Sequence, residues 1–262
     1  MELGLTGKTV LITGGSKGIG LACARAFLAQ SARVALVSRS QANLDAAVQE
    51  LGSAANSQLL AVAADLKDAA SAQAMIANVD AQWGGIDVLV NSAGAAKRYL
   101  PKDLTAASWH DAMDAKYFTY IHTMDAVLPR MAAKGRGAVV NIIGMGGKVA
   151  TPYHLPGGAA NSALMLATVG LATVYGPQGI RVNAINPAAT MTGRVQEALR
   201  LEAKMQGVSE QQVLAQGEAK VPLRRYASPE DVADLTLFLA SDRASYITGA
   251  LIPMDGGANP VI

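Results

Sequence analysis

The stretch Thr13-Gly14-Gly15-Ser16-Lys17-Gly18-Ile19-Gly20 decides the fold of this chain. It follows the apolar run Val10-Leu11-Ile12 and leads into residues 21–30, whose apolar side chains recur at helical spacing. A strand, a glycine turn and a helix start in this order form an anion site, because the first helical N–H groups and the positive dipole end face the turn. Glycines let the backbone approach a phosphate closely, although a tight strand-to-helix turn needs glycine even where nothing binds.

Composition excludes several classes of protein. The 262 residues are enough for one α/β domain or two smaller ones. A net charge of +2 and scattered basic residues exclude the electrostatic footprint of a nucleic-acid partner. Cys23 is the only cysteine, which excludes an internal disulfide framework and favours a reducing compartment. The start of the chain is unlike a signal peptide, and Lys, Arg, Asp or Gly interrupts the apolar runs, so we expect a cytoplasmic protein with no membrane partner.

Apolar runs and helical stretches alternate along the chain. The runs that predict strands are residues 9–12, 33–37, 58–63, 86–90, 138–143, 181–185 and 250–254. The stretches that predict helices are residues 21–30, 41–51, 69–83, 106–134, 159–175 and 229–239. Nearly continuous apolar strands between helices indicate an α/β fold with a doubly wound, Rossmann-like parallel sheet of about seven strands and helices on both faces. No linker divides the sequence, so residues 1–262 are predicted to form a single domain.

One segment departs from this alternation. Residues 188–221 are polar and Met-bearing, with helical spacing at Val195, Leu199 and Met205. An insertion between the sixth strand and its next helix lies at the carboxyl ends of the strands, where ligands of such sheets bind. We predict a substrate lid here, with a merely packed helical hairpin as the alternative.

Further motifs follow the glycine turn in a fixed order. They are Asp65-Leu66, Asn91-Ser92-Ala93-Gly94, Arg181-Val182-Asn183, Asn186-Pro187, Thr248-Gly249 and Asp255-Gly256-Gly257. With Thr13 to Gly20 they span nearly the whole sequence, and the chain resembles a full-length member of the short-chain dehydrogenase/reductase family. The resemblance implies a nicotinamide-dinucleotide site and a homotetramer built through the helices at 106–134 and 159–175.

The predicted cofactor site combines this resemblance with charge. It contains Gly14, Ser16, Lys17, Gly18, Ile19, Gly20, Ser38, Arg39, Asp65, Leu66, Asn91, Ala93, Gly94, Pro187, Thr190 and Thr192. By resemblance the glycine turn holds the pyrophosphate and Asp65 with Leu66 holds the adenine. The Asn91 to Gly94 motif lines the ribose and nicotinamide side, and the segment after Pro187 flanks the carboxamide. The family's usual Pro-Gly is Pro187-Ala188 here.

Cofactor choice depends on the end of the second strand. An NAD-preferring protein places an acid there against the ribose 2′-hydroxyl, whereas this chain has Ser38 followed by Arg39. No carboxylate repels a 2′-phosphate at that point, Arg binds phosphate bidentately, and Lys17 supplies a second cation. We therefore predict NADP(H), with two solvated surface charges as the alternative.

The family's usual catalytic residues are a Tyr, a Lys four residues later, a Ser about thirteen residues earlier and an Asn on an earlier helix. Counting from Asn141, the Ser position falls on Gly144, the Tyr position on Gly157 and the Lys position on Asn161. The Asn position falls on Lys116. A carbonyl accepts hydride readily only if something stabilises or protonates the developing alkoxide, so other groups must serve here.

Candidate replacements lie nearby. The amide of Asn161 and the ammonium of Lys116 have exchanged places relative to the family pattern, which predicts a pocket with one cation and one amide beside the nicotinamide. Tyr153 and His154 precede Gly157 and are candidate proton donors, with packing at a subunit contact as the alternative. Lys148 is a further candidate in the same loop. The pair Lys97-Arg98 is interpreted as solvated or as facing an anionic substrate. Gly157 and Gly158 either shape the turn into the next helix or leave space beside the nicotinamide.

Three functions remain open at this point. The first is an NADP(H)-dependent oxidoreductase acting on a carbonyl, an alcohol or an activated double bond, with Lys116 as the electrostatic group and Tyr153 or His154 as proton donor. The second is a non-redox lyase, hydratase or isomerase on the same scaffold, and the third is an NADP(H)-binding subunit without chemistry of its own. Each takes a small-molecule ligand, and no metal site is predicted.

Overall fold

A computed structural model describes residues 2–52, 57–94 and 97–259, in which a seven-stranded parallel sheet has the order β3-β2-β1-β4-β5-β6-β7. The strands are β1 (Thr9–Thr13), β2 (Arg33–Ser38), β3 (Leu59–Ala63), β4 (Val88–Asn91), β5 (Gly137–Ile142), β6 (Ile180–Pro187) and β7 (Leu251–Met254). The helices are α1 (Gly18–Ala29), α2 (Gln41–Leu51), α3 (Ala69–Trp83), α4 (Ala106–Ala112), α5 (Thr119–Lys134), α6 (Leu155–Tyr175), α7 (Gly193–Gln206), α8 (Glu210–Glu218) and α9 (Pro229–Ala240). This confirms the predicted fold class.

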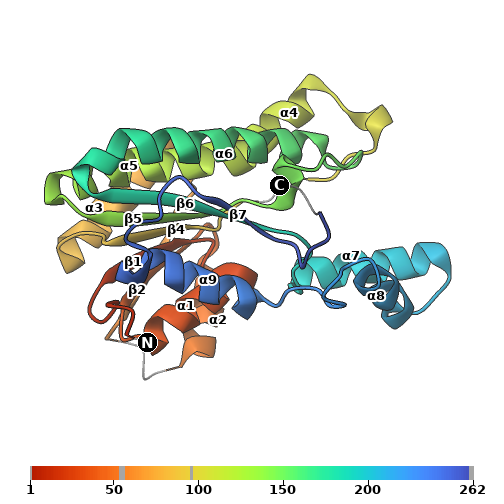
Figure 1. Cartoon of the computed structure of the whole chain (residues 1–262), viewed down its shortest axis with the longest axis horizontal. Helices are drawn as coiled ribbons and strands as arrows, with labels where there is room; N and C mark the ends of the chain where they lie inside the picture. The colour runs from red at the N-terminus through yellow and green to blue at the C-terminus, as the bar shows by residue number, and fades with distance from the viewer. Residues whose placement is uncertain (1, 53–56, 95–96, 260–262) are drawn as a thin grey trace.

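Helices cover both faces of the sheet. One layer contains α3, α5 and α6, and the other contains α1, α2 and α9 (Figure 1). Strand β1 explains why the apolar runs are nearly continuous: Val10 and Ile12 pack on the α1 side, whereas Leu11 packs on the α5 side, and all three are fully buried. A strand buried on both faces needs apolar residues at every position.

Strand order reverses at β1, which places the glycine turn at the switch point between β1 and β4. The two strands are in register with Thr13 beside Asn91. The Thr13 hydroxyl accepts hydrogen bonds from the backbone N–H groups of Ser92 and Ala93, both at 3.1 Å. The segments after β1 and β4 are thereby held together at the edge where ligands of open α/β sheets bind.

Helix α9 begins as its sequence predicts. The Ser228 hydroxyl accepts from the Asp231 N–H at 3.1 Å, and the Asp231 carboxylate accepts from the Ser228 N–H at 2.7 Å. Pro229 occupies the first helical position. This is a complete capping box, which satisfies two N–H groups that a helix start otherwise leaves without partners.

The helix predicted over residues 106–134 occurs with these bounds, but its hydrogen bonding changes in the middle. Helix α4 ends at Ala112, a π-helical turn follows over Met113–Phe118, and α5 begins at Thr119. A π turn has no sequence signature comparable to helical spacing, and it is frequent at functional sites. Lys116 lies within it.

Helix α6 begins at Leu155, four residues earlier than predicted, so Gly157 and Gly158 lie inside the helix and do not form a turn before it. A Cβ on Gly158 would lie 2.7 Å from the Gly146 carbonyl oxygen, so this glycine permits close packing of α6 on the turn at Met145–Gly147.

Residues Leu155–Gln178 are long and apolar enough to span a membrane, with a mean hydropathy of 1.3, contrary to the sequence expectation. In this fold α6 packs on the sheet beside α5 (Figure 1).

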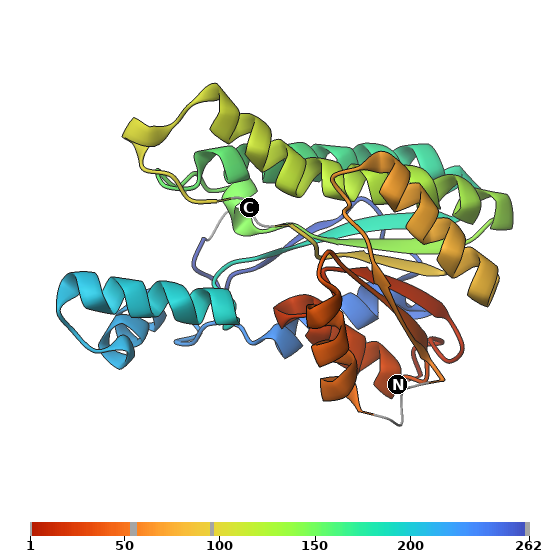
Figure 2. The same ribbon diagram turned by 180° about the vertical axis from the view of Figure 1, so that it is seen from behind.

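The segment after β6 forms a helical hairpin. Helices α7 and α8 project beyond the carboxyl ends of the strands (Figure 2). Leu199, Ala203 and Val213 form a small apolar cluster between them, separate from the two layers of the main core. The predicted insertion at 188–221 is therefore a helical hairpin, and its role as a substrate lid stays a prediction.

Candidate functional site

A cavity of about 920 Å³ lies at the carboxyl edge of the sheet. Its walls come from the glycine turn, the ends of β2, β3, β4, β5 and β6, the π turn and the start of α7. The predicted cofactor residues that line it are Gly14, Ser16, Lys17, Gly18, Ile19, Ser38, Arg39, Asp65, Leu66, Ala93, Gly94, Pro187, Thr190 and Thr192. A cavity of this size, which extends from Arg39 to Lys116, accommodates a dinucleotide.

The glycines of the turn are required by space and by backbone conformation. Gly14 has φ +65°, and a Cβ there would lie 2.8 Å from the Cα of Ala93. A Cβ on Gly20 would clash with the Gly14 carbonyl oxygen. Gly18 opens α1 with φ +54°, and Lys17 caps the helix without a side-chain hydrogen bond. The turn thus presents the N-terminus of α1 to the cavity, as an anion site requires.

Asn91 and Gly20 are the two predicted cofactor residues that do not line the cavity. The Asn91 amide is fully buried; it donates to Asn141 Oδ1 at 3.0 Å and accepts from the Thr123 hydroxyl at 2.8 Å. This side chain therefore joins β4 to β5 and α5. It supports the wall of the site from behind.

Basic side chains flank the end of β2. Arg39 and Lys17 are both exposed and both line the cavity. Ser38, at the end of β2, lines it as well, and the cavity wall at this point carries no Asp or Glu directly after the strand. The arrangement suits a doubly charged phosphate group.

Lys116 is the buried cation of the site. Its Nζ donates to the Tyr120 hydroxyl at 2.7 Å and to the Ile142 carbonyl oxygen at 3.0 Å, and the side chain lines the cavity. Burial and, to a smaller extent, the charge of Arg194 together lower the pKa of Lys116 from 10.5 to about 7. The amine therefore gains and loses a proton near neutral pH.

Tyr120 completes this group from α5. Its hydroxyl donates to the Ile142 carbonyl oxygen at 2.5 Å, and its side chain is fully buried. Burial raises the pKa of Tyr120 far above its usual value, so the phenol stays protonated. It holds the lysine amine in place as a neutral partner.

The three remaining positions of the family's catalytic set lie around the start of α6. Gly144, at the position that the resemblance assigns to the serine, lines the cavity with φ +129°, a conformation that a serine would adopt only under strain. Asn161 is buried next to it: a Cβ on Gly144 would lie 3.4 Å from the Asn161 amide nitrogen. Asn161, Gly157 and Gly158 are not among the cavity's lining residues.

The candidate proton donors Tyr153 and His154 lie outside the cavity lining as well. Tyr153 is 55% exposed. His154 is partly buried, and its Nδ1 has no hydrogen-bond partner among the described residues. Burial lowers the pKa of His154, and the charges of Arg98, Lys116 and Arg194 lower it further.

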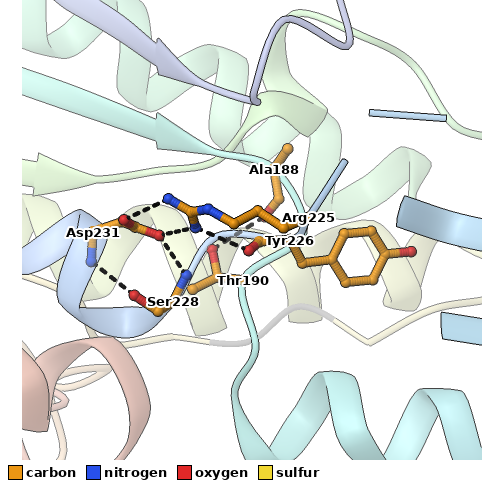
Figure 3. A network of polar contacts seen from close by, with 6 residues as sticks. All are labelled: Ala188, Thr190, Arg225, Tyr226, Ser228 and Asp231. Atoms are coloured by element: carbon orange, nitrogen blue, oxygen red, sulfur yellow. Dashed lines mark hydrogen bonds and ion pairs between the residues drawn. The ribbon is translucent and has the colours of Figure 1, made fainter. Parts of the chain in front are cut away.

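The base of the α7–α8 hairpin is fixed to α9 and β6. The Met191 N–H donates to the Ala227 carbonyl at 2.8 Å, and the Ala227 N–H donates to the Ala189 carbonyl at 3.1 Å. Figure 3 shows Arg225 against Asp231, and the guanidinium-to-carboxylate distances are 2.5 and 3.0 Å. These contacts hold the first turn of α7, and with it Arg194, against the cavity.

Sequence reasoning missed two residues of this site. Tyr120 follows Lys116 by four residues, a spacing that brings side chains together on a helix and that would have identified the pair. Arg194 carries no comparable signal, because its approach to Lys116 depends on how the hairpin lies on the sheet.

Comparisons with known proteins agree with this geometry. Residues 14–259 match the family model described as Enoyl-(Acyl carrier protein) reductase. Oxidoreductase UcpA of Salmonella typhimurium is 35% identical, over 97% of this chain and 95% of that protein. D-threitol dehydrogenase of Mycolicibacterium smegmatis is 33% identical, over 97% of this chain and 93% of that protein.

A solved structure extends the likeness to the whole fold. L-sorbose reductase from Gluconobacter frateurii, complexed with NADPH and L-sorbose, superposes with a TM-score of 0.93 and 29% identity over 100% of both chains. Strand order, the glycine turn, the family model and these relatives lead to one conclusion. The chain belongs to the short-chain dehydrogenase/reductase family of oxidoreductases.

Proposed function

We propose that this protein is an NADP(H)-dependent oxidoreductase that interconverts a carbonyl compound and an alcohol, with Lys116 in place of the family's usual acid–base residue. The observation that carries the proposal is a buried amine of pKa about 7 in the wall of a dinucleotide-sized cavity. The coarser part, oxidoreductase activity, follows from family membership.

The residues present fit the cofactor. The Gly14 and Gly20 positions leave no room for a Cβ, the turn presents a helix N-terminus, and Arg39 with Lys17 suits the 2′-phosphate. NADPH in the related L-sorbose reductase supports the same choice. When bound, NADPH supplies the hydride that reduces the carbonyl carbon.

Lys116 then serves as the acid. An ammonium has three N–H groups, and two of them are used by the Tyr120 hydroxyl and the Ile142 carbonyl. The third is free for a substrate oxygen, so the ammonium stabilises the developing alkoxide and donates a proton to it. In the oxidation direction the neutral amine accepts the proton from the alcohol. A pKa near 7 is close to the optimum for both roles.

This proposal changes the roles predicted from sequence. Lys116 carries both the electrostatic and the proton-transfer function, whereas Tyr153 is too exposed to be held against a substrate. Asn161 is close to Gly144 but is not among the residues that line the cavity with Lys116. The charge of Lys116 contributes to the lowered pKa of His154, so the two side chains lie near each other.

The test is reduction of a carbonyl panel. Purified protein is mixed with NADPH and aldehydes, ketones including L-sorbose, and enones, and the loss of NADPH absorbance is followed. Lys116→Met should lower kcat about 10²- to 10⁴-fold, the usual worth of a general acid. Lys148, a candidate from the sequence, is exposed and is not among the residues that line the cavity, so the same change there is the matched control and should leave the rate unchanged. NADPH binding without turnover on any compound would refute the redox proposal.

One observation favours a second candidate. An amine with a pKa of about 7 is largely neutral above that pH and can also act as a base or nucleophile without hydride transfer, as in a lyase, hydratase or isomerase. Incubation of the same panel with cofactor-free protein, followed by product analysis, distinguishes the two. A third candidate, an NADP(H)-binding subunit without chemistry, is excluded by turnover of the isolated chain.

We also infer a homotetramer in the cytoplasm, with α5 and α6 in the subunit contact. Leu166 and Val174 on α6 are 77% and 61% exposed, although apolar side chains on a helix prefer burial. Light scattering should give four chains per particle at micromolar concentration. A monomer would refute the assembly and leave the chemistry untouched.

A further inference from the structure

Basic side chains gather at the Lys116 end of the cavity. Lys97, Lys116 and Arg194 all line it. The Tyr99 N–H donates to the Tyr153 carbonyl at 3.1 Å, which ties the segment that carries Arg98 to the segment that carries His154. Three separate parts of the chain therefore bring positive charge to one place: the segment after β4, the π turn and the first turn of α7.

These charges lack acidic partners within the described parts of the chain. Lys97 and Arg194 form no ion pair there, whereas Arg200, on the same helix α7, is paired with Glu210 at 3.6 Å. Glu197 also lines the cavity, but it forms no ion pair with Arg194 in that part of the structure. Like charges held together are unfavourable until a counter-charge binds between them.

His154 adds an independent sign of a missing ligand. Its Nδ1 is buried, and no hydrogen-bond partner for it occurs in residues 2–52, 57–94 or 97–259. The imidazole lies beside Gly146, where a Cβ would be 3.2 Å from the His154 Cδ2. Burial, and then the charges of Arg98, Lys116 and Arg194, lower the pKa of His154, which favours the neutral ring, with one nitrogen to donate and one to accept a hydrogen bond.

We propose that the substrate is an oxo acid, whose carboxylate binds between Lys97 and Arg194 while its carbonyl oxygen contacts Lys116. This inference rests on the proposed reduction of a carbonyl group. Arginine suits the role because its planar guanidinium pairs bidentately with a carboxylate. The site is distinct from the one for the cofactor phosphate: Arg39 follows β2, whereas Lys116 lies beyond β4, and β1 separates those two strands.

Matched pairs of substrates test the proposal. Pyruvate, acetoacetate and levulinate differ in the spacing between carbonyl and carboxylate, and each has a neutral methyl ester. With NADPH, the acid of suitable spacing should have a kcat/KM at least about tenfold above that of its ester, because hydrogen bonds to charged groups contribute that much. Arg194→Ala and Lys97→Ala should each bring the ratio of the acid's kcat/KM to the ester's close to one. The ratio is the readout, because Arg194 also contributes to the lowered pKa of Lys116 and its removal changes the rates with acid and ester together.

Arg200→Ala is the control, because it removes the same charge from the same helix at a position outside the cavity lining. It should leave both acid and ester unaffected. Esters reduced as well as acids, with no effect of Arg194→Ala, would overturn this inference and leave the proposed function intact. If neither the acids nor their esters are reduced, the result counts against the proposed function. The binding of the acids to the protein then tests the inference.

Binding is followed at His154 by NMR in protein saturated with NADP⁺. The chain has three histidines, and the signal that disappears in His154→Gln assigns the resonance. Adding the three acids should raise the pKa of His154 in at least one case, since a bound anion offsets the nearby positive charges. The methyl esters should leave the pKa of His154 unchanged. In the Arg194→Ala variant, the acids should leave it unchanged as well. An unchanged His154 pKa with all three acids would overturn the proposal even if no turnover occurs.

Discussion

Replacing Lys116 by Met should stabilise the protein and abolish its activity. The substitution keeps the length and most of the volume of the side chain but removes the amine. No group is left without a partner, because Tyr120 still donates to the Ile142 carbonyl at 2.5 Å. The wild-type amine is buried among neutral partners, with a pKa that falls from 10.5 to about 7. At 1.36 kcal/mol per pKa unit, burial of the charged form costs about 5 kcal/mol.

The free-energy cost of burying the charged form of Lys116 depends on pH, because the folded and unfolded chains bind a different number of protons. Between pH 7 and 10.5 the unfolded chain holds a proton on Lys116 that the folded chain has lost, so the wild-type free energy of unfolding rises with pH. The penalty is complete below pH 7 and disappears above 10.5. Lys116→Met lacks this dependence, so its stability advantage over wild type should shrink by about 1.36 kcal/mol per pH unit above 7.

Urea unfolding of both proteins at half-unit steps from pH 6.5 to 8.5 measures this difference. Cys23 and Tyr120, whose pKa values burial also raises, are present in both proteins and cancel in the comparison. NADPH oxidation measured in parallel should fall about 10²- to 10⁴-fold in the variant. A stability difference that is constant with pH would show that the Lys116 pKa is not depressed, and an active variant would remove Lys116 from the chemistry.

Three further changes test other parts of the site. Tyr120→Phe removes an acceptor from the Lys116 ammonium, so the pKa of Lys116 should fall further and the pH–rate profile for reduction should move to lower pH; an unshifted profile would contradict the contact. Arg39→Asp should raise the KM for NADPH at least about tenfold by repelling the 2′-phosphate and lower the KM for NADH, and equal effects on both would remove Arg39 from the cofactor choice. Gly20→Ala should cost about 1–3 kcal/mol of unfolding free energy and weaken NADPH binding in a fluorescence titration, because its Cβ would clash with the Gly14 carbonyl oxygen; unimpaired binding would mean that the turn can relax.

Much of the fold was predictable because strands buried on both faces leave nearly continuous apolar runs. The seven predicted strands all occur, with ends that differ by one or two residues at most positions. The π turn at Met113–Phe118 was not predictable, since its widened geometry leaves the apolar spacing on either side almost unchanged. The start of α6 was placed too late, because Pro156 at a first turn is compatible with a helix while the glycines after it argue against one.

The site was predictable where a motif is local. The glycine turn and the segments after β4 and β6 line one cavity because parallel strands end at the same edge of the sheet. The role of Asn91 could not be predicted from the sequence, because only the structure shows that its amide is hydrogen-bonded to Asn141 and Thr123. Arg194 belongs to the site only because contacts such as Met191 with Ala227 fix the hairpin, and such long-range contacts leave no periodic trace in the sequence.

The energetics of Lys116 bear on whether the site is used or merely inherited. A buried ammonium whose partners are a phenol and a carbonyl gains no ion pair to offset the loss of water, so a hydrophobic residue of equal size would make a more stable protein. Disuse would therefore favour its replacement, whereas an acid–base role requires the depressed pKa that this burial produces. The backbone agrees with this interpretation. Gly144 has φ +129°, so a serine there would be strained, and the Ile142 carbonyl two residues earlier holds both the amine and Tyr120. The proposed departure from the family's usual residues is thus one coherent arrangement, in which we infer that the lysine delivers the proton.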